Sequence, residues 1–444
     1  MARKARTLTR PHSAYWRLRA KENALLTHVG PGTPCGEYLR RFWQPIELAS
    51  AVADRPIALR ILGEDLVLFR DRSGRLGLLE QRCSHRGASL EFGRITEQGI
   101  QCCYHGWHYA VDGRVIETPV EPPDFRPKLY HGAYPVREAA GLIFAYMGPP
   151  EESPDFPAFD FFDEPARARL YYKRHSPCNW LQVRDNEVDN SHGAFLHTVM
   201  AGVQLSAAYH ELPLMDWRES PLGILATQIR RIKDKVFVRV NELIMPNLVR
   251  IAGIDDGEGV TMCDRRGPII NWCVPIDDTN SWVIGWNVIE PNLPNPRRDA
   301  YMDREVRAGH DPATHPQLNF QLGQDGDRPL EERRSVPGDW DAWVSQGPIT
   351  IHAQEHLGPN DYGVVLYRKL VRDGINAVAA GREVKGLVRR ANGPIDTYAN
   401  NTVMPVPTHP STEDDTRACL EFGLGVIVRT LSGELRREAA SAQP

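Results

Sequence analysis

The first third of the chain alternates short apolar segments with turn residues, from about residue 56 to residue 148. Asp71–Gly74 is typical of a hairpin turn, and Asp112-Gly113 marks a second turn. The apolar segments are predicted to be short strands: Ile57–Leu62, Asp65–Arg70, Leu76–Leu79 and Gly141–Tyr146. This pattern predicts a small all-β unit.

A proline-rich segment separates this unit from a longer second region. Residues 149–165 hold five prolines and several acids, which predicts a linker. The second region begins with a predicted helix near Trp180–His197, and a later helical pattern covers Asp361–Arg390. Between them lie longer alternating segments typical of an antiparallel sheet: Gly223–Ile232, Val236–Met245, Leu248–Ile254, Ile270–Ile276 and Trp282–Ile289.

Two further segments carry little regular pattern. Glu290–Arg334 is polar and proline-rich, which predicts a loop or lid, and Leu431–Pro444 is expected to be a frayed tail. The whole pattern predicts an α+β protein, in which a small all-β domain precedes a larger domain with an antiparallel sheet flanked by helices. We expect an N-terminal arm and helix over residues 1–45, the β-domain over 46–150, the linker over 151–166 and the larger domain over 167–444.

Composition and charge exclude several classes of protein. The 444 residues are 41% hydrophobic and 25% charged, and the formal net charge is −4, so the chain offers no strong field for nucleic acid or an anionic membrane. No apolar run approaches the roughly 20 residues of a membrane span. The eight cysteines are spread along a chain without a secretory signal, which predicts reduced thiols and a cytoplasmic location. The basic segment up to Lys21 is expected to be a flexible arm.

Two short cysteine and histidine motifs form the first candidate metal site. Cys83 and His85 are one residue apart, and Cys102 and His105 follow at the spacing of a second hairpin loop. Two cysteines and two histidines suit either a structural zinc ion or a 2Fe–2S cluster in which the cysteines hold one iron and the histidines the other. Cys103 does not fit the spacing and is expected to be a small buried neighbour, as are the unpaired cysteines elsewhere in the chain.

A second candidate site lies on the predicted helix. Asp189 and His192 are three residues apart and share one helix face, whereas His192 and His197 are five apart, about 140° around an ideal helix. Both histidines can reach one metal only if the helix bends or bulges, and Gly193 between them makes this easier. Two histidines with a distant carboxylate form the facial triad of non-haem Fe(II) oxygenases.

The two motifs together resemble those of the Rieske non-haem iron aromatic ring-hydroxylating oxygenases. Cys83–Gly87 and Cys102–Trp107 resemble the two Rieske loops, and Asn186–His197 resembles the mononuclear iron signature. Val29–Pro34 and Glu355–Gly358 resemble the phthalate dioxygenase-like branch, whose members are terminal oxygenase alpha subunits. The resemblance implies a Rieske 2Fe–2S cluster on Cys83, His85, Cys102 and His105, and a larger domain of the helix-grip type.

The resemblance also implies a complete ligand set for a mononuclear Fe(II). His192 and His197 are two of its ligands, and Asp341 occupies the place where this branch carries its aspartate. The stretch around it is shorter than usual in the family, so Asp339 stays an alternative. Asp189 resembles the aspartate that hydrogen-bonds His192 and, across a subunit interface, the cluster ligand His105, which makes it a catalytic residue without being a ligand.

Partners and substrate are also implied by the resemblance. Such an oxygenase uses O2 and takes electrons from NADH through a separate flavin and 2Fe–2S reductase, with or without a ferredoxin, and it assembles as a homotrimer or a multiple of one. The chain has no dinucleotide-binding fingerprint of its own. The branch mostly hydroxylates or demethylates aromatic acids, which predicts an aromatic carboxylate in a mainly apolar pocket, held by at least one of four arginines: Arg230, Arg231, Arg239 and Arg250. A neutral aromatic, an aryl ether and an alkylammonium are the alternative substrates.

A different class of protein has to be weighed against this one. An electron carrier or a structural zinc protein would need only the β-domain, and the second histidine pair would then be accidental. The chain adds nearly 300 residues with a second metal signature beyond the β-domain, which favours the oxygenase.

Overall fold

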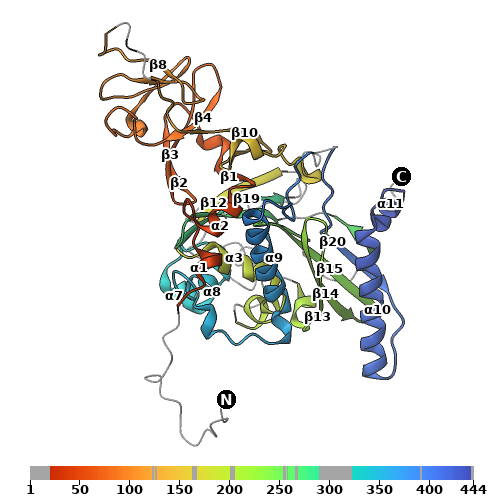
Figure 1. Cartoon of the computed structure of the whole chain (residues 1–444). Helices are drawn as coiled ribbons and strands as arrows, with labels where there is room; N and C mark the ends of the chain where they lie inside the picture. The colour runs from red at the N-terminus through yellow and green to blue at the C-terminus, as the bar shows by residue number, and fades with distance from the viewer. Residues whose placement is uncertain are drawn as a thin grey trace, which may run out of the picture.

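The chain forms two β-rich units, and Figure 1 shows the smaller one (orange) standing out from one end of the larger one. The computed structural model describes residues 21–122, 125, 128–162, 168–200, 206–253, 257, 259–265, 269–289, 323–390 and 393–441. The basic segment at residues 1–20 and most of the predicted loop, residues 290–322, lie outside the described residues.

The smaller unit consists of antiparallel strands joined by tight turns, as the sequence predicts. One four-stranded sheet holds β2 (Ile57–Ile61), β3 (Glu64–Arg70), β4 (Leu76–Glu80) and β9 (Ala133–Tyr134). A second holds β5 (Arg94–Thr96), β6 (Gly99–Gln101), β7 (His108–Tyr109) and β8 (Val115–Glu117). A third sheet joins this unit to the larger one through β1 (Trp43–Leu48), β11 (Leu142–Tyr146) and β10 (Val136–Ala139).

The larger unit is built on one antiparallel sheet. Its strands, in spatial order, are β12 (Ala168–Ser176), β19 (Asn280–Ile289), β18 (Ile269–Asp277), β16 (Leu248–Ile251), β15 (Lys235–Ile244), β14 (Gly223–Ile232) and β13 (Leu214–Glu219). β20 (Asn400–Pro405) pairs with β15 and with β17 (Thr261–Asp264). The tight turn between β14 and β15 includes Lys233, whose φ of 56° is left-handed. The α+β fold predicted from the sequence is confirmed.

Helices cover the sheet from both sides. α10 (Thr412–Leu431) lies along β14 and β15, whereas α3 (Trp180–Val188) packs against β18 and α9 (Tyr362–Ala379), as Figure 1 shows. The shorter helices are α1 (Ala24–Thr27), α2 (Pro34–Leu39), α4 (His192–Ala194), α7 (Leu330–Ser335), α8 (Asp339–Val344) and α11 (Glu434–Ser441). None of the described helices is both long and apolar enough to cross a membrane.

The predicted frayed tail is wrong over part of its length. Residues Glu434–Ser441 form α11, and Leu435 on this helix is only 1% exposed because it packs into the apolar cluster beneath α10. Burying one leucine side chain contributes about 1.5–3 kcal/mol to stability. This contribution offsets the low stability that so short a helix has by itself.

Candidate metal centres and pocket

The second histidine motif lies where one helix ends and a distorted one begins. Asn179 caps α3 by accepting a hydrogen bond from the backbone N–H of Leu181, and α3 ends at Val188. The chain then turns through Asp189 into α4, which continues as a π-helical segment over Phe195–Met200. The bulge that the five-residue spacing requires is therefore confirmed. It brings the imidazole centroids of His192 and His197 to 5.4 Å.

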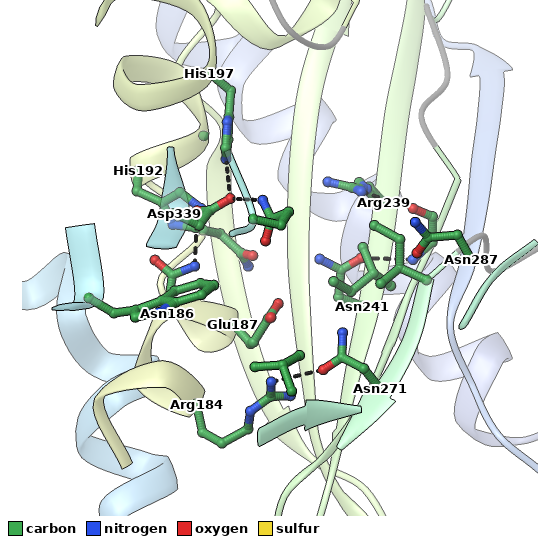
Figure 2. A pocket seen from close by; sticks show the side chains of 18 of the residues that line it. Arg184, Asn186, Glu187, His192, His197, Arg239, Asn241, Asn271, Asn287 and Asp339 are labelled. Carbon is green, nitrogen blue, oxygen red and sulfur yellow. Dashed lines mark hydrogen bonds and ion pairs between the residues drawn. The ribbon is translucent and has the colours of Figure 1, made fainter. Parts of the chain in front are cut away.

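One carboxylate joins this histidine pair. Asp339, at the start of α8, places Oδ1 3.5 Å from His192 Nε2 and Oδ2 3.3 Å from His197 Nε2. One ligand atom of each of the three side chains lies within 4.8 Å of the other two, and Figure 2 shows the three converging at one wall of a pocket. Two imidazoles and one carboxylate at this spacing fit a mononuclear non-haem iron and leave other positions open.

The surroundings of Asp339 keep its carboxylate charged. Burial by itself would raise the pKa of this side chain, which is 5% exposed, but the imidazoles of His197 and His192 hold the pKa well below its usual range. Asn186 donates a hydrogen bond from Nδ2 to Asp339 Oδ1 at 3.1 Å, and Gln324 donates to Oδ2. Both oxygens are thereby held in place facing the histidines.

Asp341, the third ligand expected from the sequence, does not lie with the histidines, whereas the alternative, Asp339, does. Its Oδ2 accepts hydrogen bonds from Arg328 Nη2 at 2.7 Å and from the backbone N–H of Gly338 at 3.0 Å. Arg333 lies 3.3 Å from Oδ1. Side chains two residues apart on a helix point in nearly opposite directions, so Asp341 faces away from the histidines. Its carboxylate instead caps the N-terminus of α8 and pairs with Arg328 and Arg333.

Asp189 contacts His192, but through its main chain. The backbone carbonyl of Asp189 accepts a hydrogen bond from His192 Nδ1. Because a carbonyl only accepts, Nδ1 carries the proton and Nε2 is free to bind a metal. The carboxylate of Asp189 accepts hydrogen bonds from the backbone and hydroxyl of Ser191, and its Oδ2 stays 3.9 Å from His192 Nδ1. The carboxylate side chain is 29% exposed.

The four residues of the first motif lie on two loops of the smaller unit that are built alike. In each loop the cysteine carbonyl accepts a hydrogen bond from the N–H of a glycine four residues later, at 2.8 Å for Cys83 and 3.1 Å for Cys102. Both glycines are left-handed, with φ values of 75° and 74°. The loops bring the imidazole centroids of His85 and His105 to 4.5 Å. The cysteines are 3% exposed.

The donor set fits a two-iron cluster better than a single zinc ion. His85 Nδ1 is buried and has no hydrogen-bond partner, which leaves it available to a metal. A zinc ion would draw four ligand atoms to one point, yet among the described residues the only group of three or more ligand atoms within 4.8 Å of one another is the one around Asp339. Separate cysteine and histidine pairs are what a Rieske cluster requires.

One expectation about the cysteines is wrong. Cys103 is exposed, not buried. The five cysteines outside the two loops are buried, as expected: Cys35, Cys178, Cys263, Cys273 and Cys419.

The pocket beside the histidines lies between α3, α8 and the large sheet. It encloses about 940 Å³ not filled by protein atoms, its open mouth included. Its walls contain the aromatic rings of Tyr172, Tyr209 and Trp343. The remaining polar lining consists largely of amides and arginines, several of them labelled in Figure 2: Gln228, Asn241, Asn271, Asn287, Arg174, Arg184 and Arg239. The larger part of the exposed lining is nevertheless apolar, as the sequence predicts.

Of the four arginines singled out in the sequence, only Arg239 lines this pocket. Its Nη2 donates to the carbonyl of Ala252 at 2.8 Å, whereas Nε is buried without a hydrogen-bond partner. Arg231 points to the opposite face, where it pairs with Asp415 of α10. The other two are held elsewhere, Arg230 by the carbonyl of Glu211 and Arg250 beside Asp160.

Similarity to known proteins distinguishes an oxygenase from an electron carrier or a structural zinc protein. Residues 42–135 match the family model of the Rieske 2Fe-2S domain. The chain is 40% identical to the tert-butanol monooxygenase / tert-amyl alcohol desaturase oxygenase subunit of Aquincola tertiaricarbonis, over 90% of this chain and 88% of that protein. This chain belongs to the Rieske oxygenases. It is an oxygenase subunit with a Rieske 2Fe–2S domain and a non-haem iron domain, and the electron-carrier and zinc alternatives are excluded.

Two other matches define the relationship further. This Rieske oxygenase is 35% identical to the phenoxybenzoate dioxygenase subunit alpha of Ectopseudomonas oleovorans, over 88% of this chain and 95% of that one. The crystal structure of dicamba monooxygenase bound to dicamba superposes with a TM-score of 0.55 at 19% identity, over 77% of this chain and 99% of that chain. The latter match supports the fold alone.

Several polar residues of the pocket carry no signal in the sequence. Arg184 and Glu187 on α3 face the pocket, and burial raises the pKa of Glu187 while the nearby Arg184 guanidinium opposes that rise. Gln324 reaches Asp339 from a segment that the sequence pattern assigns to a loop. Their spacing matches no motif, because it is the packing of α3 and α8 against the sheet that brings them together.

Proposed function

We propose that this Rieske oxygenase subunit receives electrons at Cys83, His85, Cys102 and His105, and oxidises its substrate with O2 beside His192, His197 and Asp339. The observation that carries the proposal is the convergence of two imidazoles and one buried carboxylate at the wall of a pocket. When bound at these residues, a Rieske cluster supplies one-electron transfer and a mononuclear Fe(II) supplies dioxygen activation.

The protein's own groups prepare the iron site. The carbonyl of Asp189 fixes the tautomer of His192, and Asn186 orients the carboxylate of Asp339. The bulge in the helix after α4 turns His197 toward the same point as His192. These contacts preorganise three ligands before any metal binds, so that little conformational entropy is lost on binding.

We infer that the substrate is an aromatic carboxylate held by Arg239. The unpartnered Nε of this buried guanidinium is a donor that a carboxylate from the ligand would satisfy. The rings of Tyr172, Tyr209 and Trp343 suit the faces of an aromatic ring. The likeness to the phenoxybenzoate dioxygenase subunit supports the same substrate class.

A small alcohol is the second candidate substrate. The relative with 40% identity is named for tert-butanol and tert-amyl alcohol. Asn241, Asn271 and Asn287 line the pocket with amides, which hydrogen-bond a hydroxyl as readily as a carboxylate. A neutral alcohol would leave the charge of Arg239 without an anionic partner at Nε, so the aromatic acid is preferred.

The electron path suggests the partners. Figure 1 shows the strands near β8, which carry the cluster loops, at the far end of the molecule from α3 and α8. A head-to-tail homotrimer would place the cluster loops of one subunit beside the partly exposed carboxylate of Asp189 in the next. We infer a flavin and 2Fe–2S reductase as the electron donor, with or without a ferredoxin, and a cytoplasmic location that keeps the thiols reduced.

Steady-state oxidation tests the substrate proposal directly. The purified subunit with a plant-type 2Fe–2S reductase and NADH should consume O2 with phthalate or 3-phenoxybenzoate, and should be inactive without the reductase. Arg239→Leu should raise the apparent KM for the acid roughly 10- to 100-fold, because a charge-assisted hydrogen bond contributes about 1.5–3 kcal/mol. Arg231→Leu, on the opposite face, is the matched control and should leave KM unchanged. Product from tert-butanol but from no acid would refute the carboxylate.

A further inference from the structure

A buried histidine outside both metal motifs stands directly behind the first cluster loop. His131 is 1% exposed, and its backbone N–H donates to the carbonyl of Gly113 at 2.8 Å. Gly113 has a left-handed φ of 83°, and a Cβ there would lie 2.0 Å from the carbonyl oxygen of His131. The turn that contains Asp112-Gly113 therefore fixes the place of this histidine in the fold.

Both ring nitrogens of His131 form hydrogen bonds. Nε2 lies 2.8 Å from the carbonyl oxygen of Glu80 at the end of β4, and Nδ1 lies 2.7 Å from the hydroxyl of Ser84. A carbonyl only accepts, so Nε2 carries the proton. Burial lowers the pKa of His131, which favours the neutral ring, and Ser84 then donates to Nδ1. The ring thus ties the loop between Cys83 and His85 to a strand end.

The imidazole of His131 also packs against Tyr109, whose hydroxyl lies next to Cys83. The imidazole of His131 lies 4.5 Å from the ring of Tyr109, centroid to centroid, and Tyr109 is fully buried. The hydroxyl oxygen of Tyr109 is 3.0 Å from Cys83 Sγ. A cluster-bound thiolate has no proton to give, so the tyrosine donates in the loaded protein. Hydrogen bonds to cluster sulfurs stabilise the added electron and raise the reduction potential.

We propose that His131 is a positioning residue for the Rieske cluster, which holds Ser84 and the ring of Tyr109 so that the Tyr109 hydroxyl donates to Cys83. This inference rests on the proposed assignment of Cys83 as a cluster ligand. His131 acts without touching a ligand atom: it fixes one side of the donor–acceptor pair through the Tyr109 ring and the other through the residue next to Cys83.

The test is the midpoint potential of the cluster in the purified full-length protein, followed by EPR in a redox titration without O2, substrate or reductase. Tyr109→Phe should lower the potential, because it removes the donor. His131→Leu should lower it in the same direction, and Ser84→Ala by a smaller amount. His131→Gln is the matched comparison, because its amide can accept from Ser84 and donate to Glu80 but offers no ring to Tyr109; its potential should fall by less than that of His131→Leu.

Double variants show whether the effects share one cause. In the Tyr109→Phe background, His131→Leu and Ser84→Ala should produce no further fall. An unchanged potential in His131→Leu with an intact cluster would overturn the proposal. So would a double variant whose potential falls by the sum of the two single-variant falls. If His131→Leu loses its cluster, Ser84→Ala decides, and an unchanged potential in that variant refutes the role. An unmodified protein without a Rieske EPR signal would instead overturn the proposed function and this inference with it.

Discussion

Exchanging aspartate for asparagine at two positions of α8 separates a metal ligand from a structural residue. Asp339→Asn keeps the size of the side chain but removes the negative charge between two imidazoles, 3.5 and 3.3 Å away. Loss of a group that only orients a ligand costs about 10- to 100-fold in metal affinity, so loss of the ligand itself should exceed roughly 100-fold. We expect this variant to fold and to lose the mononuclear iron.

Asp341→Asn should behave in the opposite way. The side chain of Arg328 is 1% exposed and loses its ion pair with Asp341, although it keeps a longer one with Glu332 and a hydrogen bond to the carbonyl of Val336. Removing one partner of a buried ion pair costs about 3–5 kcal/mol of stability. Because Arg328 keeps its contact with Val336, the loss in this variant should lie toward the lower end of that range. The asparagine can still accept from the backbone of Gly338. Stability should fall while the iron of the folded protein is retained.

The assay combines iron analysis with thermal unfolding of both purified variants. Asp339→Asn should show the cluster spectrum, no mononuclear iron and no product. Asp341→Asn should show a full complement of iron and a lower Tm. Iron lost from Asp341→Asn and kept by Asp339→Asn would refute the ligand assignment.

The remaining predictions concern the cluster, electron transfer and pH. Cys83→Ser should abolish the Rieske visible spectrum, whereas Cys103→Ser, at an exposed position, should leave it intact. Asp189→Asn should keep both metals but slow reoxidation of the reduced cluster by O2 in a single turnover; an unchanged rate would contradict its bridging role. Burial raises the pKa of Glu242 from 4.5 to about 8, so the folded chain holds this proton where the unfolded chain releases it. Stability should therefore fall by about 1.4 kcal/mol per pH unit across that window, and Glu242→Gln should flatten the fall in denaturant titrations at pH 5 and pH 8.

Local patterns were enough to predict most of the fold. The apolar segment Gly223–Ile232 predicted a strand, and β14 has the same bounds, although it is buried on both faces over most of its length. The spacing of His192 and His197 required a bulge, which the π-helical segment supplies. These features depend on residues close together in the chain.

Features that depend on distant segments could not be predicted. Asp339 and Asp341 occupy the same turn, and the choice between them is made by Arg328 and Arg333, which hold Asp341 on the other side of α8. Arg239 on β15 lines the pocket, a direction that no single-strand pattern reveals.

The central claim is that one chain holds a Rieske cluster and a separate iron at His192, His197 and Asp339. Iron, zinc and acid-labile sulfide analysis of the purified full-length protein, with EPR of its reduced form, tests it most directly. The account predicts two cluster irons with two sulfides, one further iron and a Rieske signal. Zinc without iron, or cluster iron without the further iron, would contradict it.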